Sequence, residues 1–324
     1  MKKIIFVADQ YVKEYPFGGA ELTTEAILKD CKLPIERVYS HLLTVDYINT
    51  NKNAYWLFGN FYNIKEELLL HISQNLSYSI LEYDYKYCVF RSSEVHQLNT
   101  KTKCNCHNER HGKIVAVFFN MAKNLFWMSE AQRDFYFSLF PFLSKKNNIV
   151  LSSVFDLEDL ELLTNLDCKN KNDVWLILGS SSAIKGIPAS IQYAQTNNLK
   201  YEIIKNLPRK ELLEKMAASK GLIFQPLGKD TCPRLVIEAK LLECELIIND
   251  NVQHGKESWF DNTKEKTLEY LKSRTKIFWN IIYDNISFSS VKKNKFLIVV
   301  PFYNVEKWID KNFNSIKNQC YSDF

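Results

Sequence analysis

The stretch Val174-Trp-Leu-Ile-Leu-Gly-Ser-Ser-Ser-Ala-Ile-Lys-Gly186 decides the fold. It opens with an uninterrupted apolar run, which is typical of a strand buried on both faces of a sheet. A loop with glycine at both ends follows, and residues 188–195 then have the composition of a helix. A buried strand that leads through a short loop into a helix is the unit of parallel α/β sheets. The sequence therefore predicts an α/β fold.

The same alternation extends in both directions from this stretch. Downstream, we expect strands over residues 201–205, 221–225 and 245–249, with helices over 208–219 and 233–242. Upstream, we expect strands over residues 3–8, 38–45, 54–58, 79–83, 87–91, 113–119 and 149–152. Helices are expected over residues 20–28 and 63–76, and after the capping box that begins at Ser129. Strands alternating with helices predict parallel sheets with right-handed crossovers.

The polar stretch from Asp167 to Asp173 separates two such α/β sets. We therefore expect two Rossmann-like domains, residues 1–168 and 169–262, whose parallel sheets face a cleft. Residues 263–294 are predicted to form a helix, which packs back on the first domain, and a basic linker. Residues 295–324 begin with a fresh strand, but about 30 residues cannot bury a core of their own. This last segment is expected to be the start of a further domain.

Composition and charge exclude several classes of protein. The 324 residues are 46% hydrophobic and 24% charged, as in ordinary globular proteins. No run approaches the roughly 20 apolar residues that span a bilayer, and eight scattered cysteines favour a reducing cytoplasm. From Lys264 onward there are 11 basic and 6 acidic residues, and the remaining 31 and 31 cancel. That balance argues against a nucleic-acid partner. The basic end is explained by a solvated linker or by peripheral contact with an anionic membrane.

Three loops carry candidate binding residues. In open parallel sheets, ligands bind beyond the carboxyl ends of the strands, where helix N-termini offer N–H groups to phosphate. Gly18 and Gly19 open the first helix and allow a backbone to approach a diphosphate closely. Lys185, in the second loop, is placed to bind phosphate. Asp230 and Glu238 are placed to accept hydrogen bonds from hydroxyl groups. Taken singly, each feature is also explained by a tight turn, a solvated lysine or a charge that complements a helix dipole.

In their order and spacing, the three loops resemble those of family-4 glycosyltransferases, which have the GT-B fold. The matching residues are Gly18-Gly19-Ala20-Glu21, then Lys185-Gly186, then Asp230 and Glu238 with seven residues between them. The resemblance covers roughly residues 1–286. It implies that Lys185 binds the donor diphosphate, Glu238 the ribose and Asp230 hydroxyls of the donor sugar. It also implies sugar transfer with retention, without a metal or cofactor, from a nucleotide sugar to a glycan or lipid-linked acceptor.

This sequence departs from the family pattern at three points. Asp230 replaces the usual glutamate, Ser180 replaces the common arginine of the second loop, and the second domain is short. We expect Arg234 to supply the missing positive charge. The expected donor-binding residues are Gly18, Gly19, Ser180, Lys185, Arg234 and Glu238. Two alternatives stay open: a sugar-nucleotide 2-epimerase, and a non-catalytic sugar-nucleotide or glycan-binding module of a multidomain transferase.

The C-terminal segment has a separate resemblance. Phe296-Leu-Ile-Val-Val-Pro-Phe-Tyr-Asn304, with the following residues to Ser322, is similar to the opening of family-2 glycosyltransferases with the GT-A fold. The acidic metal-binding motif of that fold would lie beyond Phe324. The resemblance implies that a GT-A domain is a partner in a longer parent chain. A tandem of two transferases is typical of surface polysaccharide assembly.

Cysteine and histidine residues gather between positions 88 and 111. This constellation comprises Cys88, His96, Cys104, Cys106, His107 and His111. Within it, Cys104-x-Cys106-His107 with Cys88 upstream offers zinc ligands, but the spacing is not that of a standard finger. We expect these cysteines to be reduced and without metal. His96 follows the strand expected over residues 87–91 and would therefore reach the cleft, where histidine suits acid–base chemistry. Asp230, Glu238 and His96 are the candidate catalytic residues, and a structural histidine is an equally good interpretation of His96.

Overall fold

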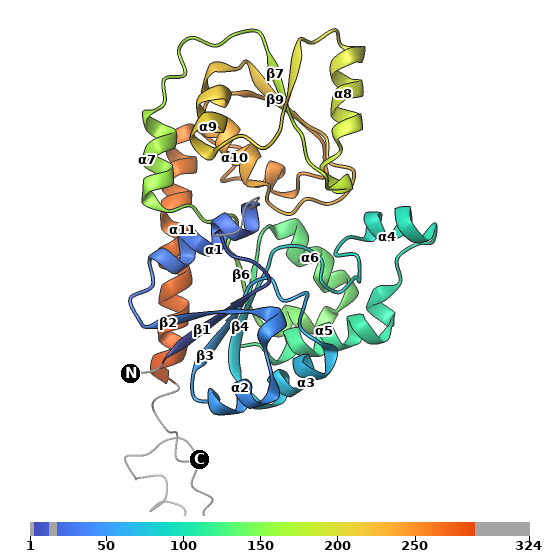
Figure 1. Ribbon diagram of the computed structural model, residues 1–324, viewed down its shortest axis with the longest axis vertical. Helices are drawn as coiled ribbons and strands as arrows, with labels where there is room; N and C mark the ends of the chain where they lie inside the picture. Colours follow the sequence, from blue (N-terminus) through green and yellow to red (C-terminus); the bar gives the residue numbers. More distant parts are fainter. Residues whose placement is uncertain (1–2, 13–17, 289–324) are drawn as a thin grey trace, which may run out of the picture. The chain divides into compact units, whose positions relative to one another are not determined.

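The computed structural model describes residues 3–12 and 18–288, in which strands and helices alternate along the chain (Figure 1). The first sheet has six parallel strands in the order β2-β1-β3-β4-β5-β6. Its strands are β1 (Ile4–Ala8), β2 (Ile35–Tyr39), β3 (Tyr55–Phe58), β4 (Ser77–Glu82), β5 (Asn124–Trp127) and β6 (Asn147–Val150). The strand order reverses at β1, which is where ligands bind in sheets of this kind.

Helices connect the strands of the first sheet. The α-helices are α1 (Gly19–Lys29), α2 (Val45–Thr50), α3 (Glu66–Asn75), α4 (Ser93–Thr100), α5 (Arg110–Met121), α6 (Glu130–Leu139) and α7 (Leu157–Asn165). Short 3-10 helices are η1 (Ser40–Leu42), η2 (Cys106–Asn108) and η3 (Pro141–Lys145). Much of the aromatic content packs inside the first half of the described chain, which contains this sheet. Phe58, Tyr78 and Phe118 have ring centroids 4.9 to 5.5 Å apart. These aromatic residues therefore build a core and are not surface stacking platforms.

The second sheet has four parallel strands in the order β10-β9-β7-β8. Its strands are β7 (Trp175–Leu178), β8 (Tyr201–Ile204), β9 (Gly221–Phe224) and β10 (Glu245–Ile248). The helices that come after β7 are η4 (Ala183–Lys185), α8 (Ile187–Thr196), α9 (Arg209–Ala218), α10 (Arg234–Leu241), η5 (Gln253–Lys256) and α11 (Lys264–Phe288). The order reverses between β7 and β9, so the loops after these two strands flank a second ligand-binding position.

Both sheets belong to one compact unit that ends at Ile282. As predicted, the helix after residue 263 packs back on the first half, because the Trp279 indole donates to the Ile27 carbonyl at 2.9 Å and Phe278 lies against Phe126. No helix in the described part combines the length and apolar character that crossing a membrane requires. The GT-A-like segment 295–324 lies outside the described residues.

Three local expectations are wrong. Residues 113–119 belong to helix α5, and the strand follows at Asn124–Trp127. A continuous apolar run fits a buried helix as well as a buried strand, so this pattern misled the prediction. Residues 87–91 form turns, with Arg91 in the left-handed region at φ 56°, and only the first part of 38–45 is strand. The other strands and helices expected from the sequence are confirmed to within a few residues.

Candidate functional site

A cavity of about 930 Å³ lies where the three loops singled out in the sequence meet. The loop after β1 contributes Gly18–Glu21, the loop after β7 contributes Gly179–Lys185, and the loop after β9 contributes Lys229–Leu235 with Glu238. Each loop leaves the carboxyl end of a parallel strand, and helices α1 and α10 begin at the cavity with Gly18 and Pro233 as their N-caps. Free backbone N–H groups at such helix starts favour an anion. All three loops therefore line one cavity.

Glycines let these loops approach one another. Gly186 has φ +62°, and a Cβ there would lie 1.8 Å from the Gln225 carbonyl oxygen. The chain therefore needs glycine at this position to turn from Lys185 into α8. A Cβ on Gly19 would lie 3.4 Å from Cβ of Arg234, so α1 starts directly against the first turn of α10. The two halves of the unit meet closely at the cavity.

Lys185 and Asp230 form an ion pair at the cavity wall. Lys185 Nζ donates to Asp230 Oδ2 at 2.6 Å, and the side chains are 29% and 12% exposed. The ammonium also lies 5.7 Å from the centroid of the Phe224 ring. A partly exposed pair of this kind contributes little to stability. Its two charges remain accessible, one to a phosphate and the other to hydroxyl groups.

Glu238 lies at the centre of a buried network. Its Oε1 accepts from Arg234 Nε at 3.0 Å and pairs with Arg209 Nη1 at the same distance. Both arginines also pair with Asp159 of α7, and Arg234 donates to the Val154 carbonyl and stacks on Phe155 at 3.7 Å. Burial lowers the pKa of Arg234, although the neighbouring carboxylates oppose that shift. The network fixes the Glu238 carboxylate at the cavity, whose lining includes it.

Arg209 was not foreseen from the sequence. It begins α9 directly after Pro208, at the carboxyl end of β8, and it lines the cavity beside Glu238. Its Nη2 is buried and makes no hydrogen bond with any described residue, although Asp159 Oδ1 lies 3.1 Å away. Burial opposes the charge of this guanidinium, but Glu238 and Asp159 together raise its pKa above the ordinary value. Arg209 therefore lines the cavity as a cation that is held in place by Glu238 and Asp159.

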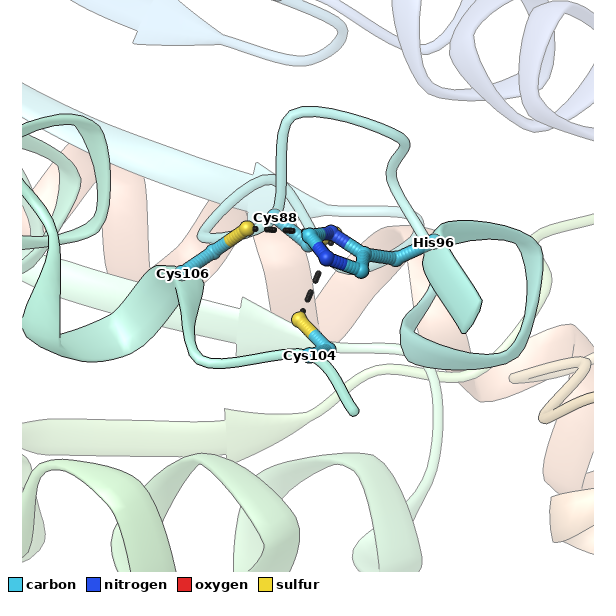
Figure 2. Close-up of side chains that lie close together, drawn as sticks. All are labelled: Cys88, His96, Cys104 and Cys106. Carbon is cyan, nitrogen blue, oxygen red and sulfur yellow. Dashed lines mark hydrogen bonds between the residues drawn. The ribbon is translucent and has the colours of Figure 1, made fainter. Parts of the chain in front are cut away.

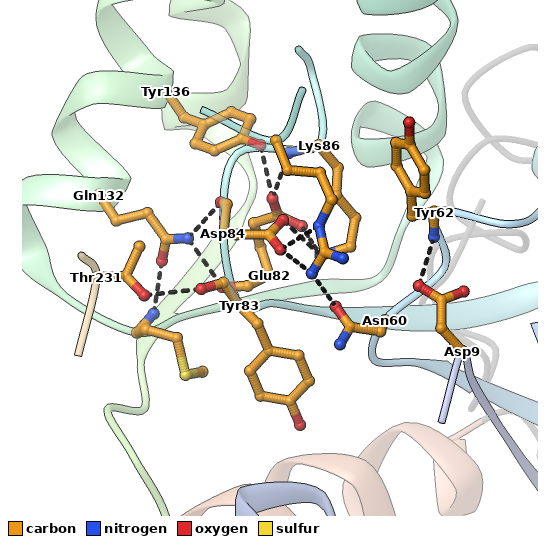
Figure 3. Close-up of polar contacts among 12 residues, drawn as sticks. Asp9, Asn60, Tyr62, Glu82, Tyr83, Asp84, Lys86, Gln132, Tyr136 and Thr231 are labelled. Atoms are coloured by element: carbon orange, nitrogen blue, oxygen red, sulfur yellow. Dashed lines mark hydrogen bonds and ion pairs between the residues drawn. The ribbon is translucent and has the colours of Figure 1, made fainter. Parts of the chain in front are cut away.

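The first half contributes a different set of charges to the opposite wall (Figure 3). Arg91 Nε donates to Asp84 Oδ2 at 2.6 Å, and Lys86 Nζ donates to Asp84 Oδ1 at 2.9 Å. Lys86 also pairs at 3.3 Å with Glu82, which accepts from the Tyr136 hydroxyl at 2.8 Å. Burial raises the pKa of Glu82 to about 7, whereas Lys86 and Arg91 hold the pKa of Asp84 below its usual value against the effect of burial. Asp84 and Arg91 line the cavity.

Several hydrogen bonds join the two halves around the cavity. Thr231 donates to the Tyr83 carbonyl at 2.7 Å, and Tyr85 donates to Gln253 Oε1 at 2.7 Å. Lys229 pairs with Glu94 of α4, and the Glu257 carboxylate accepts from the backbone N–H of Glu130 at 2.7 Å. The cavity is therefore closed on one side by direct contacts between its two walls.

Several solved structures have a similar fold. Sucrose-phosphate synthase from Thermosynechococcus elongatus has a TM-score of 0.55 at 9% identity, over 89% of this chain and all of that one. The catalytic domain of starch synthase IV from Arabidopsis thaliana, bound to ADP and acarbose, has a TM-score of 0.52 at 9% identity, over 90% and 100%. Anabaena Alr3699/HepE, in complex with UDP and glucose, has a TM-score of 0.50 at 12% identity, over 90% and 99%. No family model and no curated protein matches the sequence. The fold is GT-B.

Within this GT-B fold, all of the predicted site residues except His96 line one cavity. They are Gly18, Gly19, Ser180, Lys185, Asp230, Arg234 and Glu238. Arg234 differs from the expectation in one respect: its buried guanidinium is occupied by Glu238, Asp159 and the Val154 carbonyl, and the more exposed arginine beside it is Arg209. His96 is not among the described residues that line the cavity. Its Nδ1 faces Cys88 and Cys106 at 3.7 and 3.3 Å, because the turns at 87–91 direct α4 away from the position that a strand would have given it.

Proposed function

We propose that the chain is a glycosyltransferase that moves a sugar from a nucleotide-sugar donor to a glycan or lipid-linked acceptor in surface polysaccharide assembly. The observation that carries the proposal is the meeting of Lys185, Arg209, Asp230 and Glu238 in one cavity at the carboxyl ends of both sheets. Two cations and two helix starts suit a diphosphate, and two carboxylates suit the hydroxyls of a ribose and a sugar. The crystallised neighbours with UDP or ADP bound support a nucleotide ligand here.

In this proposal, Lys185 and Arg209 bind the diphosphate and stabilise the charge that develops on it as the sugar leaves. Such stabilisation acts most strongly where the groups are already in place and water is excluded. Arg234 is a positioning residue, because it holds Glu238 in place for the ribose. Asp230 orients the donor sugar through its hydroxyls. We propose retention at the sugar carbon and no metal in the transfer step, with the acceptor on the wall that contains Asp84 and Arg91.

A substitution at Asp230 tests the proposal. Asp230→Asn keeps the shape of the side chain but removes its charge, and it releases Lys185 from the ion pair. The free nucleoside diphosphate should bind at least as tightly as to the parent, whereas turnover of the nucleotide sugar should fall roughly 10- to 150-fold for one charged hydrogen bond. Calorimetry with the diphosphate and a transfer assay with the nucleotide sugar measure the two effects.

Two outcomes of that experiment decide between functions. An equal loss of diphosphate affinity and of nucleotide-sugar turnover would place Asp230 on the phosphates and contradict its assignment to the sugar. Tight nucleotide-sugar binding by the parent, without transfer to any glycan or lipid-linked acceptor, would favour the non-catalytic binding module. Ser180 and the four-stranded second sheet are the features that favour this second candidate.

A further inference from the structure

Four side chains outside the cavity converge on one point. Cys88, His96, Cys104 and Cys106 each direct one ligand atom to it, and these four atoms all lie within 4.8 Å of one another (Figure 2). They come from three separate segments: the turns after β4, helix α4, and the chain that leads into η2. Of the three histidines that the sequence offered in this stretch, His96 is the member of the group, and His107 and His111 are not. The structure therefore assembles a Cys3His set that the spacing of the residues did not reveal.

Three of the six distances within the group match the edges of a tetrahedron around zinc, and all six are within 4.8 Å. With Zn–S near 2.3 Å and Zn–N near 2.0 Å, the edges of a tetrahedral Cys3His site are about 3.8 Å between sulfurs and about 3.5 Å between sulfur and nitrogen. Here Cys104 Sγ lies 3.6 Å from Cys88 Sγ, and His96 Nδ1 lies 3.7 Å from Cys88 Sγ and 3.3 Å from Cys106 Sγ. A disulfide needs sulfurs about 2.05 Å apart. The cysteines of the group are free thiols at coordination distance, not at bonding distance.

The surroundings fit a bound thiolate. The backbone N–H of Phe90 points to Cys88 Sγ at 3.5 Å, the kind of hydrogen bond that orients a ligand sulfur and balances its charge. The segment with Cys106 is seated tightly on α5, since a Cβ on Gly112 would lie only 2.1 Å from the Cys106 carbonyl oxygen. By contrast, the buried thiols of Cys232 and Cys244 stand apart from this group and interact with Ser153 and the Met216 carbonyl.

Helix α4 explains why a metal is needed. None of its eight residues is buried, so apolar packing does not hold it in place. It nevertheless contributes Val95 to the cavity lining, and its Glu94 pairs with Lys229 of the second half. A short helix without a core of its own is the situation in which a structural metal replaces hydrophobic burial.

We propose that Cys88, His96, Cys104 and Cys106 bind one structural zinc ion, which anchors α4 at the edge of the cavity. This geometry leads us to revise the expectation of a metal-free cluster. All four positions of the tetrahedron are filled by side chains, so the ion has no open site for substrate and takes no part in the transfer step. The proposal is independent of the donor-site assignment.

Zinc content measures the proposal directly. Protein purified without chelators, and then supplied with zinc under reducing conditions and desalted, should contain one zinc ion per chain by elemental analysis. Cys106→Ser should lose it. Cys168→Ser and His107→Asn are the matched controls, because they change a cysteine and a histidine outside the group, and both should keep the ion.

A second measurement covers the case in which Cys106→Ser fails to fold. Titration of the parent protein with an organomercurial should release the zinc to a chromogenic chelator as the thiols of the group react, and chelation alone should lower the melting temperature of the parent and of both controls. A parent protein that retains no zinc after reconstitution would overturn the proposal. So would a folded Cys106→Ser protein that retains zinc as the parent does.

Discussion

The two walls of the cavity use charge in different ways. The second-half wall presents Lys185 and Asp230 as a partly exposed pair, with charges that a ligand can reach. The first-half wall holds Lys86 at 1% exposure between Glu82 and Asp84, behind the cavity surface. The lysine–aspartate distances are similar, 2.6 and 2.9 Å, so the burial of the lysine is the variable that differs. A partly exposed pair stabilises the fold little and remains free to bind, whereas a buried pair is costly to break.

The largest loss of stability is therefore expected on substitution of Lys86. Lys86→Met leaves the buried Glu82 without its cation, whereas Asp84 keeps Arg91, and this should lower the free energy of unfolding by about 3–5 kcal/mol. Lys185→Met should lower it by less than about 1 kcal/mol. Urea denaturation of the two variants beside the parent measures both values.

The pH dependence sharpens that comparison. Burial already raises the pKa of Glu82 to about 7, and removal of Lys86 raises it further. Protonation then relieves the uncompensated charge, so the cost of Lys86→Met should be smaller at pH 6 than at pH 8. Equal losses at Lys86 and Lys185, at either pH, would mean that burial does not distinguish the two walls.

A smaller change in stability, dependent on pH, is expected from His254, a buried titratable group of the second half. It is 0% exposed, its ring nitrogens have no hydrogen-bond partner among the described residues, and it packs against Trp259 and Phe260. Burial lowers its pKa to about 3, below the unfolded value near 6.5. As the pH falls below 6.5, the unfolded chain takes up a proton that the folded chain excludes, so stability falls.

The loss amounts to about 2 kcal/mol between pH 8 and pH 5. His254→Phe should remove this part of the pH dependence, and a substitution of the exposed His41 to Asn should leave it unchanged. Chemical denaturation at the two pH values gives the difference. An unchanged slope in His254→Phe would show that the folded protein protonates this ring.

The features that the sequence could predict are continuous along the chain. Strands such as β1, β3 and β7 are short apolar runs that end in loops, and their identity depends on neighbours in the chain. Gly19, Lys185 and Glu238 were recognisable because the loops that carry them resemble, in order and spacing, those of family-4 glycosyltransferases. Residues 113–119 misled the prediction because their apolar run is equally consistent with a helix inside the core.

Groups of side chains that come from distant segments could not be predicted from the sequence pattern. Arg209 is a single arginine after a proline, and its place beside Glu238 depends on how α9 and α10 pack. His96 was expected at the cleft because residues 87–91 look like a strand, but the left-handed Arg91 turns the chain and brings the imidazole to three cysteines. The pairing of Lys86 with two acids depends on its burial, which a mixed polar and apolar stretch does not indicate.

The most direct test of the account is a calorimetric titration of Lys185→Met with nucleoside monophosphate and diphosphate, using the nucleotide that a thermal-shift screen of the parent selects. Diphosphate affinity should fall roughly 10- to 150-fold, because one charged hydrogen bond is lost, and monophosphate affinity should change much less. Lys210→Met, which replaces an exposed lysine on α9, is the control and should bind both ligands as the parent does. Parent-like diphosphate affinity in Lys185→Met would contradict the donor site and, with it, the proposed transferase.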